Sequence, residues 1–153
     1  MNLSYHGMRA LDSSFNVTID KQFAPDLGKV DAIAQDLSRV FLNILNNACY
    51  AANDKIKKAG AGYVPILQVR TLNLGDSIEV RIRDNGMGIP PHVLDKIFNP
   101  FFTTKPTGQG TGLGLSISHD IVVQEHGGQL EVDTVAGEFT EFVVRIPRHW
   151  RKS

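Results

Sequence analysis

Two glycine-rich turns frame the stretch from Asp84 to Leu115, and they constrain what the rest of the chain can form. The first turn, Asp84-Asn85-Gly86-Met87-Gly88, directly follows an alternating apolar and polar run that predicts a strand over 78–83. The second turn, Gly110-Thr111-Gly112-Leu113-Gly114, opens a helical pattern that extends to His126. One strand therefore ends, and one helix begins, where glycine lets the backbone approach a ligand closely.

Paired strands alternate with helices along the rest of the chain. Alternating polarity predicts further strands over 15–20, 66–70, 130–133 and 142–146, and a short one over 30–33. A helix is predicted over 36–59, ended by glycines, and a short helix follows Pro90-Pro91. The apolar stripe of the long helix comprises Leu37, Val40, Phe41, Ile44, Ala48, Ala51 or Ala52, and Ile56. Because consecutive hairpins build antiparallel sheets, we expect an α+β two-layer sandwich with a mixed, mostly antiparallel sheet and helices on one face.

Length, net charge and cysteine content limit the partners and the cellular compartment that we expect for this chain. At 153 residues the chain is long enough for one domain with its own core. The formal net charge of zero removes the attraction on which non-specific nucleic-acid binding depends, so we expect no nucleic-acid partner. A single cysteine, Cys49, excludes an intramolecular disulfide and suits a reducing compartment such as the cytoplasm. No apolar run approaches a membrane span, so this segment is expected to make no membrane contact, and anchoring of a longer parent protein stays open.

Polar residues on the predicted helix 36–59 form a first candidate site. Asn43, Asn46, Asn47 and Tyr50 lie opposite the apolar stripe, and asparagine is a poor helix former. Amide oxygens can ligate Mg²⁺, which takes few protein ligands together with phosphate oxygens and waters. For this helix alone, a solvated polar face is the simpler interpretation.

The turn at Asp84 forms a second candidate site. Its carboxylate can accept from an exocyclic amine such as that of adenine, while Gly86 and Gly88 let the backbone run against a flat ligand. Asp-Asn-Gly by itself is most often an ordinary turn.

A loop and a helix start complete the pattern. Phe98, Phe101 and Phe102 can anchor a polar loop over 103–109, in which Lys105 offers a charge to a terminal phosphate or is simply solvated. Free backbone N–H groups at the glycine-rich helix start favour anions. No Gly-Lys-Ser/Thr follows these glycines and no strand immediately precedes them, so neither a P-loop nor a dinucleotide fingerprint is present.

Four motifs, in chain order, resemble the N, G1, F and G2 boxes of sensor histidine kinase catalytic domains. They lie at residues 43–47, 84–88, 98–102 and 110–114, respectively. That family has the Bergerat (GHKL) fold, which it shares with DNA gyrase. The similarity spans roughly residues 15–147, including Gly127-Gly128 and the closing segment 137–142. It implies an ATP-binding catalytic domain over 15–148, preceded by the end of a phosphoacceptor helix over 1–14 and followed by a tail over 149–153.

The resemblance implies Mg²⁺-ATP as the bound nucleotide. Asn47 would ligate Mg²⁺, Asn43 and Tyr50 would lie on the phosphate side, and Asp84 would bind the adenine amine with Thr140 nearby through water. Asn43 and Lys105 are the expected catalytic residues. The other expected nucleotide contacts are Gly86, Gly88, Ile89, Phe102, Thr104, Gly110, Thr111, Gly112, Leu113, Gly114 and Leu115.

Three features depart from the family pattern. Asn43 stands where the ATPases of the superfamily place a glutamate that activates water, and an amide cannot act as a base, so hydrolysis should be weak. Phe139 occupies a position where glycine is common. No histidine has the acidic neighbour and downstream proline of a phosphoacceptor box; the five are His6, His92, His119, His126 and His149.

The implied function is transfer of the γ-phosphoryl group to a histidine on a dimerisation domain absent from this chain. A response regulator would then be the downstream partner, and the full-length protein would be a homodimer. The alternatives are an ATPase whose nucleotide drives clamp closure, a serine kinase of the anti-sigma type, and a degenerate kinase that only binds. Steady phosphate release would favour the ATPase, and transfer to serine would favour the serine kinase. The intact nucleotide-facing motifs argue against a degenerate kinase.

Overall fold

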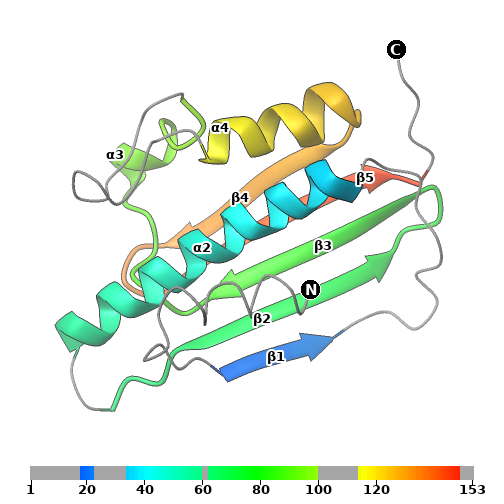
Figure 1. Cartoon of the computed structure of the whole chain (residues 1–153). Coiled ribbons are helices and arrows are strands. Elements are labelled where there is room, and N and C mark those ends of the chain that lie inside the picture. Colours follow the sequence, from blue (N-terminus) through cyan, green and yellow to red (C-terminus); the bar gives the residue numbers. More distant parts are fainter. Residues whose placement is uncertain (1–17, 23–33, 60–61, 100–113, 149–153) are drawn as a thin grey trace.

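The computed structural model describes residues 18–22, 34–59, 62–99 and 114–148, which form a sheet covered by helices (Figure 1). The sheet has five strands in the order β1-β2-β3-β5-β4. The first pair, β1 with β2, is parallel, and the three other pairs are antiparallel. The mixed, mostly antiparallel sheet expected from the sequence is therefore confirmed. The strands are β1 (Thr18–Gln22), β2 (Ile66–Asn73), β3 (Ser77–Asp84), β4 (Gln129–Val135) and β5 (Phe139–Pro147).

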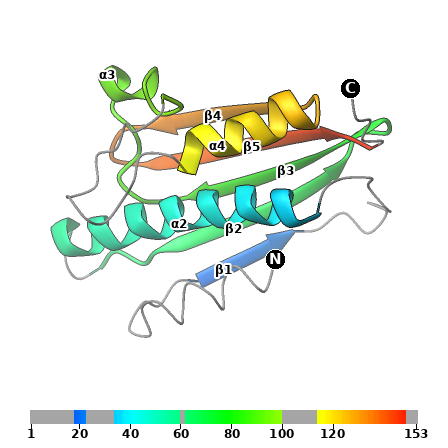
Figure 2. The ribbon, with the colours of Figure 1, turned by 45° about the horizontal axis from the view of Figure 1, so that its top comes forward.

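The helices gather on one face of this sheet (Figure 2). The long helix α2 (Ala34–Ala59) packs on β2 and β3, while α4 (Gly114–His119) runs beside it. A π-helical segment, η1 (Asp120–Glu125), continues α4 and packs on β4 and β5. The short helix α3 (Pro91–Leu94) follows the first glycine turn, as predicted. No described helix covers the opposite face of the sheet.

The core lies between the two layers. The predicted stripe of α2 is confirmed in Val40, Ile44, Ala48 and Ala52, all of which are buried. Leu45 and Cys49 are buried as well, so the apolar face of α2 is wider than the stripe. Opposite them, the sheet contributes Leu67, Val69, Val80, Ile82, Phe142, Val144 and Ile146.

Some element boundaries differ from the predictions. Residues 18–20 lie in β1 as expected, whereas 15–17 and the predicted strand over 30–33 fall outside the described residues. The predicted helix to His126 is not uniformly α-helical, because the His126 amide donates to the Ile121 carbonyl, an i to i−5 bond. The β2–β3 hairpin is longer than predicted, because pairing continues to the Leu74–Ser77 hydrogen bond at its turn.

An ion-pair network lies on the sheet face that no described helix covers. Glu79 on β3, only 3% exposed, accepts from Arg81 Nε and Arg145 Nε at 2.7 Å each. Arg81 also pairs with Glu141 and Arg145 with Glu131, at 2.9 and 2.8 Å. The hydrogen bonds and charges of the two arginines outweigh burial and lower the pKa of Glu79. These ion pairs compensate the burial of polar groups on β3 and β5.

Glu79→Gln is expected to destabilise the domain by about 2 kcal/mol, because two partly exposed guanidinium groups lose a buried carboxylate. The lowered pKa means that the ionised carboxylate stabilises the fold above its ordinary pKa. This contribution is lost as the pH falls through the lowered folded value. Urea denaturation at neutral and acidic pH measures both effects. Glu131→Gln is the control, since that side chain is 54% exposed and should change stability by less than about 0.5 kcal/mol. Equal losses in the two variants would contradict the prediction.

Candidate functional site

Asp84 is the last residue of β3 and the most buried acidic group of the candidate site. It is 3% exposed, and its Oδ1 accepts from the Gly86 amide at 2.8 Å. Burial raises the pKa of Asp84 to about 7, against the opposing effects of the Gly86 hydrogen bond and of the Lys55 and Arg83 charges. Asp84 forms no salt bridge within the described residues. A buried carboxyl group in this setting fits a donor supplied by a ligand.

The glycines after Asp84 are needed for close packing. A Cβ at Gly86 would lie 2.7 Å from the Ala51 carbonyl carbon of α2. Gly88 has a φ of +70°, and a Cβ there would overlap the Val135 carbonyl oxygen at the end of β4. The backbone of the turn is therefore held between helix and sheet at positions that only glycine can occupy.

Hydroxyl groups line the sheet side of this turn. Thr140 on β5 is the cross-strand partner of Asp84 and is 4% exposed. Its hydroxyl lies 3.0 Å from that of Thr134, which accepts from the Ile89 amide at 2.9 Å and donates to the Phe139 carbonyl at 2.8 Å. The predicted residues Asp84, Ile89 and Thr140 are thus close together. Thr134 was not predicted, because only its register on β4 opposite Thr140 places it here.

Phe139, which departs from the glycine implied by the family resemblance, begins β5. Its ring lies under the Arg83 guanidinium, 3.8 Å from the ring centroid. Its backbone carbonyl still accepts from Thr134 at 2.8 Å.

Asn43 joins the two long helical elements. Its Nδ2 donates to the Gly114 carbonyl at 3.1 Å and to the Ser118 hydroxyl at 3.2 Å. Ser118 is fully buried and donates to the same Gly114 carbonyl at 2.8 Å. Asn43 therefore fixes the start of α4 against α2 and brings both candidate motifs together.

Asn43→Ala is expected to cost about 1 to 2 kcal/mol of stability, because it removes the two part-buried hydrogen bonds that join α2 to α4. Thermal unfolding followed by circular dichroism measures the loss. Ser38→Ala, at an exposed position of the same helix, should change stability by less than about 0.5 kcal/mol. An unaltered melting temperature for Asn43→Ala would show that the two helices are held by apolar packing alone.

The other expected α2 residues, Asn47 and Tyr50, are partly buried on this helix. The neighbouring Asn46 has a buried Oδ1, the one buried side-chain polar atom in the described part of the chain without a hydrogen-bond partner. Because buried acceptors are normally satisfied, an unsatisfied amide oxygen beside Asn47 fits a cationic or hydrogen-bonding ligand.

The glycine-rich entry and its loop are only partly described. Gly114 and Leu115 open α4, and Leu115 packs against the core. The predicted site residues that lie outside the described ranges are Phe102, Thr104, Lys105, Gly110, Thr111, Gly112 and Leu113.

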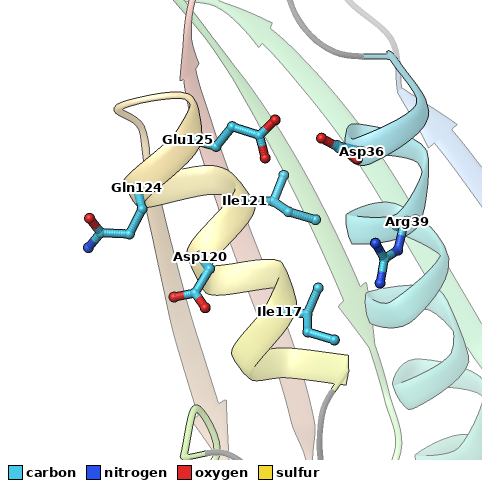
Figure 3. Close-up of a pocket in the computed structure, with 7 residues that line it drawn as sticks. All are labelled: Asp36, Arg39, Ile117, Asp120, Ile121, Gln124 and Glu125. Atoms are coloured by element: carbon cyan, nitrogen blue, oxygen red, sulfur yellow. The ribbon is translucent and has the colours of Figure 1, made fainter. Parts of the chain in front are cut away.

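A separate groove of about 480 Å³ lies between the start of α2 and the α4–η1 helix (Figure 3). Ile117 and Ile121 point from α4 and η1 toward α2, where Arg39 faces them. Asp36 and Glu125 face each other, and their hydrogen bond raises the pKa of Glu125. None of the predicted nucleotide contacts lines this groove.

Comparison with known proteins identifies the family. Residues 32–149 match the model of the histidine kinase-, DNA gyrase B- and HSP90-like ATPases. The chain belongs to this family. Among relatives of this ATPase domain, the two-component sensor PprA of Pseudomonas aeruginosa is 45% identical over 114 residues, which is 74% of this chain and 12% of PprA. The sensory histidine kinase/phosphatase NtrB of Rhizobium leguminosarum bv. phaseoli is 32% identical over 151 residues, 93% of this chain and 38% of NtrB. The domain thus spans only a small part of each relative.

Solved structures share the fold of this ATPase domain. The nucleotide-free catalytic domain of the histidine kinase ThkA superposes with a TM-score of 0.77 at 27% identity, covering 97% of this chain and 91% of that one. The mycobacterial sensor histidine kinase MprB gives 0.75 at 26% identity, covering 98% and 93%. The α+β sandwich of the Bergerat type is therefore confirmed. In the described part, no helix combines the length and apolarity needed to cross a membrane.

Proposed function

We propose that this ATPase domain binds Mg²⁺-ATP and serves as the catalytic domain of a sensor histidine kinase. The observation that carries the proposal is Asp84, a buried carboxyl group without a salt bridge in the described residues, beside Gly86 and Gly88. The similarity to a two-component sensor and to sensor kinases supports the same assignment.

At the adenine end, Asp84 accepts from the exocyclic amine of the base. Thr140 and Thr134 supply hydroxyl groups beside the carboxylate, and they suit a bridging water. The Gly86 and Gly88 backbone lies along the ring, and Ile89, partly buried against the core, offers an apolar contact. The base is thus recognised mainly by one charged acceptor in an apolar surrounding.

At the phosphate end, Asn47 holds Mg²⁺, which would neutralise phosphate charge when bound. The Asn46 oxygen, buried without a hydrogen-bond partner, supports the proposal of a cation or donor near this part of α2. Asn43 and Tyr50 lie on the phosphate side, and Asn43 keeps the glycine-rich helix start in place. The loop contacts proposed for the phosphates are Phe102, Thr104, Lys105, Gly110, Thr111, Gly112, Leu113, Gly114 and Leu115.

The proposed reaction moves the γ-phosphoryl group to a histidine of a dimerisation domain. A lone pair on the imidazole forms the P–N bond while the bond to the β–γ bridging oxygen breaks and ADP leaves. The domain contributes position and charge neutralisation, with Lys105 as the candidate cation. Asn43, an amide engaged with α4, supplies no base for water, so hydrolysis is slow.

The partners follow from this reaction. They are the phosphoacceptor domain and, through it, a response regulator, with the full-length protein a cytoplasm-facing homodimer. The similarity to a two-component sensor supports the response regulator as a partner.

A three-part experiment tests the function. Calorimetry with ATP, with and without Mg²⁺, is combined with a phosphate-release assay and with labelled ATP in the presence of a separately supplied dimerisation domain. We expect Mg²⁺-assisted binding, negligible phosphate release and an acid-labile label on the added domain. Sustained phosphate release would favour a clamp ATPase, an acid-stable label would favour a serine kinase, and no binding would overturn the proposal.

A further inference from the structure

Lys55 on α2 joins three segments around the candidate adenine site. Its Nζ donates to the Asn85 carbonyl at 3.2 Å and to the Gly137 carbonyl at 3.0 Å. Asn85 directly follows Asp84, and Gly137 lies in the β4–β5 turn. The Gly137 amide in turn donates to the Met87 carbonyl at 2.6 Å. The Lys55 ammonium group therefore links α2 to two turns, the Asp84 turn and the β4–β5 turn. The β4–β5 turn is itself bonded to the Asp84 turn through Met87.

Tyr63, in the segment that leads into β2, binds the same Asn85 carbonyl as Lys55. Its hydroxyl lies 3.0 Å from both the backbone carbonyl and the side-chain Oδ1 of Asn85. Its ring lies beneath Lys55, whose Nζ is 4.9 Å from the ring centroid. The cation therefore rests on an aromatic face while two of its protons reach carbonyls.

Asn85 itself is held from several directions. Its Oδ1 accepts from the Ile66 amide at 2.8 Å, and its Nδ2 donates to the Val64 carbonyl at 2.9 Å. Its own amide bonds to the Ile66 carbonyl at 3.3 Å. The residue between Asp84 and Gly86 is therefore fixed in both backbone and side chain, and Lys55 and Tyr63 hold its carbonyl.

From this geometry we propose that Lys55 and Tyr63 are positioning residues for adenine recognition. They fix the Asn85 carbonyl and thereby the orientation at which Asp84 and the Gly86 backbone meet the base. The inference rests on the proposed function and extends it to residues that make no contact with the nucleotide in this role. Preorganisation of this kind raises affinity by reducing the ordering that binding requires.

The charge of Lys55 has a second consequence at Asp84. The groups that act on this carboxyl group are Lys55 and Arg83, which favour its ionised form, while burial opposes ionisation. Burial, with the Asp84 charge as the smaller cause, raises the pKa of Cys49 to about 11 and that of Tyr63 to about 12. Lys55 therefore helps to keep Asp84 able to accept from an amine.

Lys58, one turn further along α2, provides a matched comparison. It pairs with Asp54 at 3.1 Å, and its side chain is 62% exposed. It thus shares the helix and the charge of Lys55 but makes a solvent-exposed i,i+4 pair instead of bonds to the Asp84 turn.

The test measures the dissociation constant of ADP by calorimetry from about pH 6 to about pH 9, together with melting temperatures. The variants are Lys55→Met, Lys55→Arg and Tyr63→Phe, with Lys58→Met as the control. We expect Lys55→Met to weaken ADP binding by about tenfold to a hundredfold and to move the pH midpoint of binding upward. Tyr63→Phe should weaken binding by about threefold to tenfold without moving the midpoint, and Lys55→Arg should recover most of the affinity.

Each outcome bears on a different claim. If Lys55→Met binds ADP as Lys58→Met does, the positioning role of Lys55 is overturned. If Lys55→Met loses affinity at an unchanged pH midpoint, the effect of the Lys55 charge on Asp84 is overturned instead. If Lys55→Met does not fold, Tyr63→Phe and Lys55→Arg decide, and wild-type affinity in Tyr63→Phe would overturn the role of Tyr63. Absence of ADP binding by the wild type would instead overturn the proposed function, and this inference with it.

Discussion

Replacing Asp84 by asparagine is expected to weaken ATP and ADP binding at least about a hundredfold, because a buried charged acceptor for the adenine amine is lost. The asparagine oxygen can still accept from the Gly86 amide, so the turn itself should persist. Calorimetric titration at pH 8 with each nucleotide measures the loss.

The same substitution should leave the nucleotide-free domain equally or more stable at pH 8. The folded pKa of Asp84, about 7, lies above its ordinary value, so the folded state binds this proton more tightly than the unfolded state. The stability due to Asp84 is therefore greatest at low pH. It declines as the pH rises from the ordinary value to about 7, by up to roughly 4 kcal/mol. Removing the charge relieves this cost only where wild-type Asp84 is ionised.

Melting temperatures at pH 8 and pH 5 separate the two effects. We expect the stability advantage of Asp84→Asn to be present at pH 8 and to shrink at pH 5, where the wild-type group is protonated. Asp133→Asn, at an exposed position on β4, is the control and should change neither binding nor this pH dependence. A clearly lower melting temperature of Asp84→Asn at pH 8 would mean that the carboxylate is structural.

Gly88→Ala is expected to destabilise the domain by about 3 kcal/mol or more and to weaken nucleotide binding. The new Cβ would overlap the Val135 carbonyl oxygen and lie 2.9 Å from the Ala136 Cα, both of them backbone atoms that no rotamer change can move. The φ of +70° adds roughly 1 kcal/mol of strain for a residue with a side chain. Urea denaturation and ADP titration measure the two effects.

Gly127 offers a control with nearly the same backbone conformation. Its φ is +68°, but a Cβ there would meet no atom within 4 Å. Gly127→Ala should therefore cost about 1 kcal/mol, from backbone strain alone, and leave nucleotide binding intact. Equal losses at Gly88 and Gly127 would show that the contact with β4 is relieved by a small shift of the β4–β5 turn.

Much of the site was readable from local patterns. Asp84 ends a strand whose alternation gives its burial, and Asn43 follows from its position on a long amphipathic helix. The hydrogen bonds of Asn43 could not be predicted from the sequence, because their partners Gly114 and Ser118 lie 71 and 75 residues further along the chain. The prediction that Asn47 ligates Mg²⁺ stays a prediction.

The sequence by itself determined the family through the resemblance of its ordered motifs, including Asp84 and its glycines. It determined the order of the elements because strands and helices repeat at their own periods. Only the tertiary structure decided which distant residues support the site. Lys55, Tyr63 and Thr134 carry no local signal. They reach this segment because strand pairing and helix packing place the Lys55 and Tyr63 donors beside the Asn85 carbonyl and the Thr134 acceptor beside the Ile89 amide. Such contacts depend on how segments far apart in the sequence are placed relative to one another. Local sequence periodicity does not specify that placement, so these contacts are known only from the tertiary structure.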